Sequence, residues 1–177
     1  MKKTAFTLIE TLIVVVIVAV LATAVTAGYS NARTRSRDAR RVSDMTSLQA
    51  ALEGYNQSEG SHPLCTNTIG GDQWCGTCSP GGYSEFQAAL QPLADKGYLP
   101  LIAKDPLNDS SSGSQCYTYE YYTPNQSITN TITCGGKPLS SFEYVMRFGT
   151  EKAVLNHPVF SYDRVDGMEY CVTGPGK

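Results

Sequence analysis

The chain has 177 residues, which is enough for one modest domain with an extended element, and its 41% hydrophobic content is ordinary for a globular protein. The net charge of −2 is unevenly distributed, because residues 1–41 carry seven Lys and Arg against two acids, whereas the remainder carries seven basic and fourteen acidic residues. One end therefore suits an anionic surface, and the other suits a solvated acidic head. The sequence has no nucleophile–base pair and no phosphate-binding loop, so we expect neither an enzyme nor a small-molecule substrate.

Residues 6–27 form an apolar run in which Glu10 is the only ionisable side chain. A helix of this length spans about 33 Å at about 1.5 Å per residue, which matches a bilayer core of about 30 Å. A core helix of a soluble domain would have a polar face, and this run has none. We therefore predict one transmembrane segment at residues 6–27. A conventional signal peptide cleaved after Ala24 and a plain single-span anchor remain alternatives.

A short basic leader precedes the apolar run, in which Lys2 and Lys3 are followed by the small residue Ala5. This order, with Phe6 opening the run and Glu10 inside it, resembles the prepilin signature of type IV pilins and of type II secretion pseudopilins. The resemblance implies that residues 1–5 are a leader peptide, that a prepilin peptidase cleaves between Ala5 and Phe6, and that Phe6 becomes an N-methylated N-terminus. The family usually has Gly where this chain has Ala5.

Glu10 has two interpretations. Thr7 and Glu10 fit the capping-box pattern at the start of a helix. The resemblance implies instead that Glu10 neutralises the N-terminal amine of a neighbouring subunit during assembly, which is physically reasonable because an unpaired buried ammonium is costly. One carboxylate can serve both roles in succession, as a cap before assembly and as a partner afterwards.

Beyond the apolar run the chain stays compatible with a helix, since no proline occurs before Pro63. Apolar residues recur there at three- and four-residue spacing, which predicts an amphipathic stripe packed against the head; these residues are Val42, Met45, Leu48, Leu52 and Tyr55. We therefore predict one helix over residues 6–57, about 75–80 Å long. Gly54 and residues 58–60 are its predicted end.

Five arginines lie just beyond the apolar run: Arg33, Arg35, Arg37, Arg40 and Arg41. They are interpreted either as a solvated helix face beside lipid headgroups or as contacts to the acidic heads of adjacent subunits. No base-reading feature accompanies them, so nucleic acid is not an expected partner. The positive-inside rule favours a cytoplasmic location for these arginines, whereas the prepilin signature places the head outside, and we follow the signature.

Residues 58–177 are predicted to form a globular head. Strand-like runs occur at residues 116–122, 142–148 and 168–173, and residues 85–96 are predicted to form a short helix despite Pro92. A long helix packed on a small antiparallel sheet gives an α+β fold. The segment 97–108 also resembles the loop that many pilins and pseudopilins carry before their sheet.

Six cysteines lie outside the apolar run: Cys65, Cys75, Cys78, Cys116, Cys134 and Cys171. An even number in a small domain beyond the membrane predicts structural disulfides, with 15 possible connectivities. We favour a Cys116–Cys134 bond. Cys75 and Cys78 imitate a thioredoxin-type redox pair, and Cys65 with these two would supply part of a zinc site, but the breakers at residues 79–82 and the absence of a second such pair argue against both.

Oxygen donors suited to calcium occur at Asp105, Asn108, Asp109, Asp163 and Asp166, and some pseudopilins bind calcium in their head loops. We favour the alternative in which the Asp and Asn residues near Pro106 stabilise a turn. No cofactor or metal is therefore predicted, with calcium as the alternative.

The predicted function is that of a structural pilin subunit. Its expected partners are copies of itself in a helical filament, the prepilin peptidase and the inner-membrane assembly machinery. The expected location is the cytoplasmic membrane, as a single-pass protein, before assembly and an extracellular filament afterwards. A type II secretion pseudopilin is the first alternative, and the cysteine-rich head favours the pilin. A single-span anchored extracytoplasmic binding or redox domain is the second.

Overall fold

The structure is a computed structural model that describes residues 7–65, 74–76, 82–108, 117–123, 133–152, 160–165 and 168–176, without the side chains of residues 24–28, 74, 162–165 and 168–169. The elements in chain order are α1 (Leu8–Glu59), β1 (Trp74–Cys75), α2 (Gly82–Asp95), β2 (Tyr119–Tyr122), β3 (Thr133–Cys134), β4 (Lys137–Pro138), a 3-10 turn η1 (Leu139–Ser141), β5 (Val145–Phe148), β6 (Ser161–Val165) and β7 (Met168–Thr173). The predicted α+β fold is confirmed.

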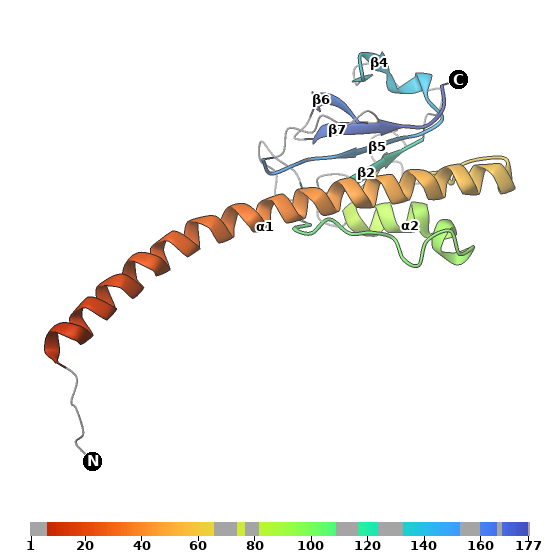
Figure 1. Cartoon of the computed structure of the whole chain (residues 1–177). Coiled ribbons are helices and arrows are strands. Elements are labelled where there is room, and N and C mark those ends of the chain that lie inside the picture. The colour runs from red at the N-terminus through yellow and green to blue at the C-terminus, as the bar shows by residue number, and fades with distance from the viewer. Residues whose placement is uncertain are drawn as a thin grey trace.

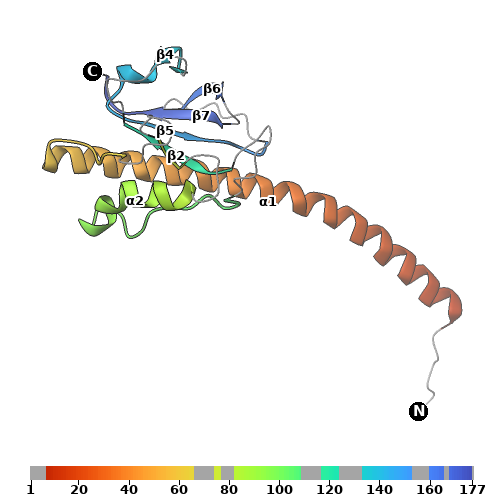
Figure 2. The same cartoon turned by 180° about the vertical axis from the view of Figure 1, so that it is seen from behind.

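Helix α1 has 52 residues and dominates the shape of the molecule (Figure 1). Thr7 caps its start, and Gly60 ends it in the left-handed conformation at φ 76°, where its N–H donates to the carbonyl oxygen of Asn56. The N-terminal half of α1 extends beyond the head, while the C-terminal half runs along the sheet and α2, as the view from behind also shows (Figure 2). The prediction of a single helix over residues 6–57 is correct to within two residues at each end.

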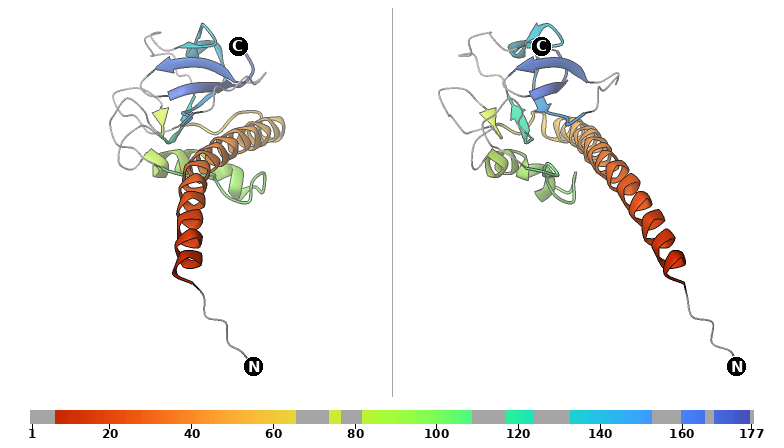
Figure 3. Two further views of the ribbon diagram at one scale, coloured as in Figure 1. Left: turned by 60° about the vertical axis from the view of Figure 1, so that its left-hand side comes forward. Right: turned by 90° about the vertical axis from the view of Figure 1, so that its left-hand side faces the viewer.

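A five-stranded antiparallel sheet covers one side of α1. The strand order is β1-β2-β5-β7-β6, with β5 pairing with β2 on one side and β7 on the other. Strands β3 and β4 form a separate two-stranded hairpin. Two further views show α2 beside the C-terminal half of α1, with the sheet above both helices (Figure 3). Helix α2 contacts β1 and β2 as well as α1, and Phe86 of α2 packs edge-on against Tyr119 of β2. The two helices therefore both pack against the sheet.

The predicted amphipathic stripe of α1 packs into the core that α1 shares with the sheet and α2. Met45, Leu48 and Leu52 are at most 1% exposed, and they belong to one core cluster together with residues of α2 and the sheet. The members from those elements include Phe86, Leu90, Leu93, Tyr121, Met146 and Phe148. Burial of an aliphatic side chain of this size is worth about 1.5–3 kcal/mol. The C-terminal half of α1 is therefore part of the folded head.

Several of the helices and strands predicted from the sequence are confirmed, and the structure adds strands that were not predicted. Strand β7 has the predicted bounds, while β2 and β5 occupy only the later part of their predicted runs. Helix α2 begins at Gly82 and contains Pro92 in its last turn. Strands β1, β3, β4 and β6 were not predicted, because three of them have only two residues and show no periodicity.

Candidate functional site

The start of α1 is a complete capping box. The N–H and the hydroxyl of Thr7 both donate to Glu10 Oε2 over 2.9 Å, and the N–H of Glu10 donates to Thr7 Oγ1 over 3.4 Å. The capping interpretation of Glu10 is therefore confirmed for the isolated chain. Both residues are exposed, so the carboxylate is open to a second partner. Ala5 and Phe6, the predicted cleavage and methylation residues, lie outside the described residues.

Beyond the cap, α1 presents apolar side chains on all sides. Leu8 is 87% and Ile9 71% exposed, and the large apolar residues from Leu12 to Leu21 are all more than half exposed. Among the described residues, no helix meets the length and hydropathy required to cross a membrane. The exposed apolar surface is continuous around the helix, whereas a helix packed on one side would carry a single stripe.

An ionic joint fixes α1 to the head where the exposed half of the helix ends; we use this name for Arg37, Asp38, Arg41, Asp105 and Glu151. At its centre the fully buried guanidinium of Arg41 donates through Nε and Nη2 to both oxygens of Asp105, over 2.6 and 3.0 Å. Its Nη1 donates to Asp38 over 2.7 Å and to Glu151 over 3.0 Å. A buried charge requires such pairing, since an unpaired one is costly.

The rest of the ionic joint ties the loop after β5 to the same helix. Arg37 donates through Nε and Nη2 to the two oxygens of Glu151, over 2.6 and 2.5 Å. Asp38 accepts the backbone N–H groups of Glu151 and Lys152, over 3.0 and 3.2 Å. Three segments therefore meet here: α1, the loop after α2 and the loop after β5.

The pKa values in the ionic joint follow from this pairing. Burial alone lowers the pKa of Arg41, but the hydrogen bonds to Asp105, Glu151 and Asp38 outweigh it, so the pKa is raised above its ordinary value. The hydrogen bond from Arg37, opposed by partial burial, lowers the pKa of Glu151. Both groups therefore stay ionised near neutral pH and hold the joint together.

The ionic joint corrects the interpretation of the arginines as one solvated face. Arg41 is fully buried and Arg37 is partly buried, and both bind carboxylates of the same chain. Sequence reasoning missed Asp38 and Glu151 as functional residues. The available signal was Asp38 itself, an acid within a basic run and three residues before Arg41, a spacing that places the two side chains on one helix face.

The hydrogen bonds of Asp105 confirm the turn interpretation of this residue. Asp105 Oδ1 accepts the N–H groups of Leu107 and Asn108 over 2.8 and 3.2 Å, and both of its oxygens accept from Arg41. The described residues contain no group of three His, Cys, Asp or Glu residues that could hold a metal. Asp109, Asp166 and the side chain of Asp163 lie outside the described part of the chain.

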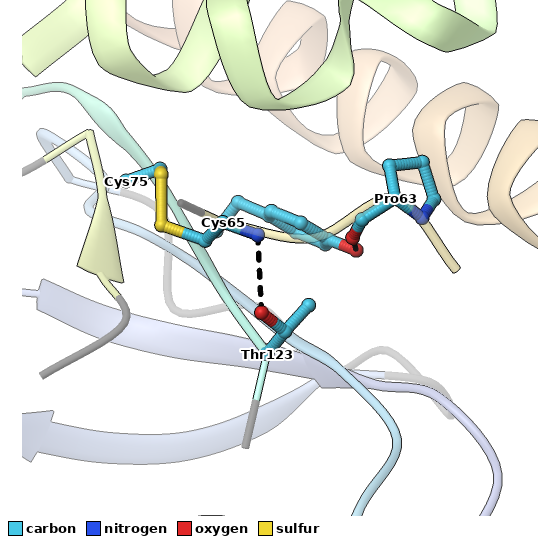
Figure 4. Close-up of a disulfide and its surroundings, with 5 residues drawn as sticks. Pro63, Cys65, Cys75 and Thr123 are labelled. Carbon is cyan, nitrogen blue, oxygen red and sulfur yellow. Dashed lines mark hydrogen bonds between the residues drawn. A yellow bond between two sulfur atoms is a disulfide. The ribbon is translucent and has the colours of Figure 1, made fainter. Parts of the chain in front are cut away.

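Two disulfides staple the described part of the head. Cys65 bonds to Cys75 and thereby joins the segment after α1 to β1, and Cys134 bonds to Cys171 and thereby joins the β3–β4 hairpin to β7. Figure 4 shows the first bond beside Thr123, whose hydroxyl accepts the N–H of Cys65 over 3.1 Å. None of the described cysteines is a free thiol. The prediction of structural disulfides holds for these four residues, and Cys78 and Cys116 lie outside the described residues.

The predicted Cys116–Cys134 bond is wrong, because the partner of Cys134 is Cys171 on β7. The bond of Cys75 to Cys65 likewise excludes a redox pair between Cys75 and Cys78 in this structure. It also removes two of the three thiolates named for a zinc site, since a metal-binding cysteine must be a free thiolate. The four described cysteines therefore have a structural role.

Comparison with known proteins supports the N-terminal pattern. The model of the family described as "Prokaryotic N-terminal methylation motif" matches residues 1–26. No curated protein and no solved structure matches the chain significantly. The matched segment contains the basic leader, Ala5, Phe6 and Glu10, together with most of the exposed apolar part of α1. The chain therefore carries the N-terminal signature of type IV pilins and pseudopilins.

Proposed function

We propose that this chain is a pilin, a structural subunit of a type IV pilus-like filament that is inserted in the membrane as a precursor, cleaved between Ala5 and Phe6, and assembled through α1. The main support is that the methylation signature lies on a helix half with apolar side chains exposed on every side. Such a surface requires lipid or other copies of the helix to cover it. A cleaved precursor uses the bilayer first and neighbouring subunits afterwards.

The first prediction concerns processing. The mature chain should begin at Phe6 and carry an N-methyl group, because cleavage there removes the basic leader and keeps the apolar helix. Intact mass and N-terminal sequencing of the protein from its native host measure this directly. A chain that begins at Met1, or at a residue beyond Ala24, would contradict the proposal.

The same preparation distinguishes the two kinds of filament subunit. A pilin is recovered in filaments sheared from the cell surface, and its deletion leaves protein secretion intact. A pseudopilin stays with the cell envelope, and its deletion blocks secretion. The disulfides described in the head favour the pilin, since cross-linked heads suit an exposed fibre.

A further inference from the structure

The fold divides the five arginines into two groups. Arg37 and Arg41 are paired in the ionic joint, and Arg40 lies 3.7 Å from the carboxylate of Asp44, one helical turn away. Among the residues that the structure describes, no carboxylate lies within 4.0 Å of Arg33 or Arg35, and both side chains are exposed. The two arginines closest to the apolar half of α1 are thus available to a partner outside this chain.

The two unpaired arginines lie on opposite sides of α1. Residues two positions apart differ by about 200° around a helix and by about 3 Å along it. A protein that docks on one face of α1 would contact only one of them. A medium that surrounds the helix at one level would contact both, and the headgroup layer of a bilayer is such a medium.

The height of these arginines fits that layer. Arg33 lies about 9 Å beyond the end of the apolar run at Ala27, and helical side chains lean toward the N-terminus, which here means toward the membrane. The Cζ atom of Arg33 accordingly lies 5.2 Å from the ring centroid of Tyr29, one turn closer to the apolar half. Tyr29 is 61% exposed, and tyrosine is enriched at the membrane–water interface.

The base of the head adds a hollow on the side of Arg33. It has a volume of about 440 Å³ and is lined by Arg33, Ser36, Arg37, Pro106 and Leu107. Arg37 is already bound to Glu151, so Arg33 supplies the uncompensated charge and Ser36 a hydroxyl donor. Leu107 is 42% exposed at this edge of the head and adds an apolar contact. A phosphate group is the anion that suits a guanidinium beside a hydroxyl donor.

We propose that Arg33, Arg35 and Tyr29, with the hollow beside Ser36, bind the headgroups of anionic phospholipids and hold the head of the unassembled subunit against the bilayer. This inference rests on the proposed membrane-inserted precursor. It assigns these residues a role before assembly, when α1 lies among lipids. The subunit must then release these headgroups when it moves from the membrane into the filament.

The test uses the full chain reconstituted into vesicles of equal parts phosphatidylcholine and phosphatidylglycerol. After gentle detergent extraction, native mass spectrometry gives the ratio of phosphatidylglycerol to phosphatidylcholine retained by each chain. One arginine near an anionic membrane surface contributes about 1 kcal/mol to binding, which corresponds to about a fivefold change in affinity. Arg33→Gln and Arg35→Gln should each lower the ratio about fivefold. Arg40→Gln is the matched control, with the same loss of charge on the same helix, and should leave the ratio unchanged.

Two measurements separate the possible failures. Resistance to carbonate extraction shows whether each variant is embedded in the membrane, and a wild-type chain that is not embedded defeats the proposed function itself. An embedded chain whose lipid ratio is unaffected by Arg33→Gln and Arg35→Gln, or is lowered equally by Arg40→Gln, overturns the headgroup inference alone. A lower filament yield with an unchanged lipid ratio overturns it too, and assigns the two arginines to a second copy of the chain.

Discussion

Glu10 is the residue at which helix capping and filament assembly use the same carboxylate. In the isolated chain it accepts from Thr7, and in the proposed filament it binds the ammonium of Phe6 on a neighbour. Glu10→Val should therefore yield a cleaved subunit that stays in the membrane, because the variant leaves that ammonium buried without a partner. Breaking a buried pair costs roughly 3–5 kcal/mol. Sheared-filament yield and membrane-fraction level, measured together, check this.

Thr7→Val is the control for Glu10→Val. It removes the capping hydroxyl at nearly constant volume and keeps the carboxylate, so it should cost only about 1 kcal/mol at the helix end and allow filaments to form. Glu10→Asp keeps the charge on a shorter side chain and should give an intermediate yield. Normal filament yield from Glu10→Val, or equal loss from Thr7→Val, would show that Glu10 acts only as a cap.

Arg41 carries the largest predicted effect on the stability of the head. Arg41→Met removes the guanidinium and leaves the carboxylates of Asp38 and Asp105 buried beside each other without their cation. Removal of one partner from a buried ion pair costs roughly 3–5 kcal/mol. The free energy of unfolding from denaturant titration should fall by that amount, whereas Arg40→Met, which breaks a pair whose arginine is 62% exposed, should change it by less than about 1 kcal/mol. Equal losses of unfolding free energy from Arg41→Met and Arg40→Met would refute the conclusion that Arg41 holds the ionic joint together.

At the scale of elements, the two described disulfides should contribute differently to the free energy of unfolding, because they close loops of different length. The Cys65–Cys75 bond spans a sequence separation of 10 and the Cys134–Cys171 bond one of 37. From loop-closure entropy, the Cys65–Cys75 bond should stabilise the fold by about 2.7 kcal/mol and the Cys134–Cys171 bond by about 3.8 kcal/mol. We expect the double substitution Cys134→Ala with Cys171→Ala to lower the melting temperature more than Cys65→Ala with Cys75→Ala. The opposite order would mean that strain, or structure in the unfolded chain, outweighs loop entropy.

The sequence predicted the elements whose signal is local. Helix α1 follows from an apolar run, a capping box and a stripe at helical spacing, all of which lie within the helix itself, and β7 follows from one contiguous run. The ionic joint depends on partners far apart in the sequence, since Arg41 and Asp105 are 64 residues apart and Arg41 and Glu151 are 110 apart. The basic run in the sequence does not indicate that its last arginine, Arg41, is buried.

The cysteine pairs show the same limit. The presence of disulfides follows from the number of cysteines and their position beyond the apolar run, but the pairing depends on how the strands are arranged. Cys134 lies in the β3–β4 hairpin and Cys171 in β7, and only the tertiary fold brings these elements together. The predicted Cys116–Cys134 pairing failed because it closed a loop across the edge of the predicted strand at residues 116–122, whereas Cys134 bonds to Cys171 on β7.

For the whole molecule, the boundary between assembly element and head lies within α1. Thr34, Asp38 and Arg41 are the first buried residues along the helix, and everything described before Thr34 is exposed. The N-terminal half therefore makes little contribution to the stability of the head. The C-terminal half contributes the ionic joint and the core stripe that begins at Met45.

This boundary predicts opposite results for two truncations. A chain that begins at residue 31 keeps the whole ionic joint and the core stripe, so it should be a soluble monomer that unfolds cooperatively. A chain that begins at residue 42 keeps the core stripe but lacks Arg37, Asp38 and Arg41, which leaves Asp105 buried without its cation. It should lose at least about 3–5 kcal/mol of unfolding free energy. Denaturant titration and sedimentation velocity on the two chains measure both outcomes. Equal stability would place the head boundary beyond the ionic joint, whereas aggregation of the longer chain would show that the apolar half of α1 is needed for folding as well as for assembly.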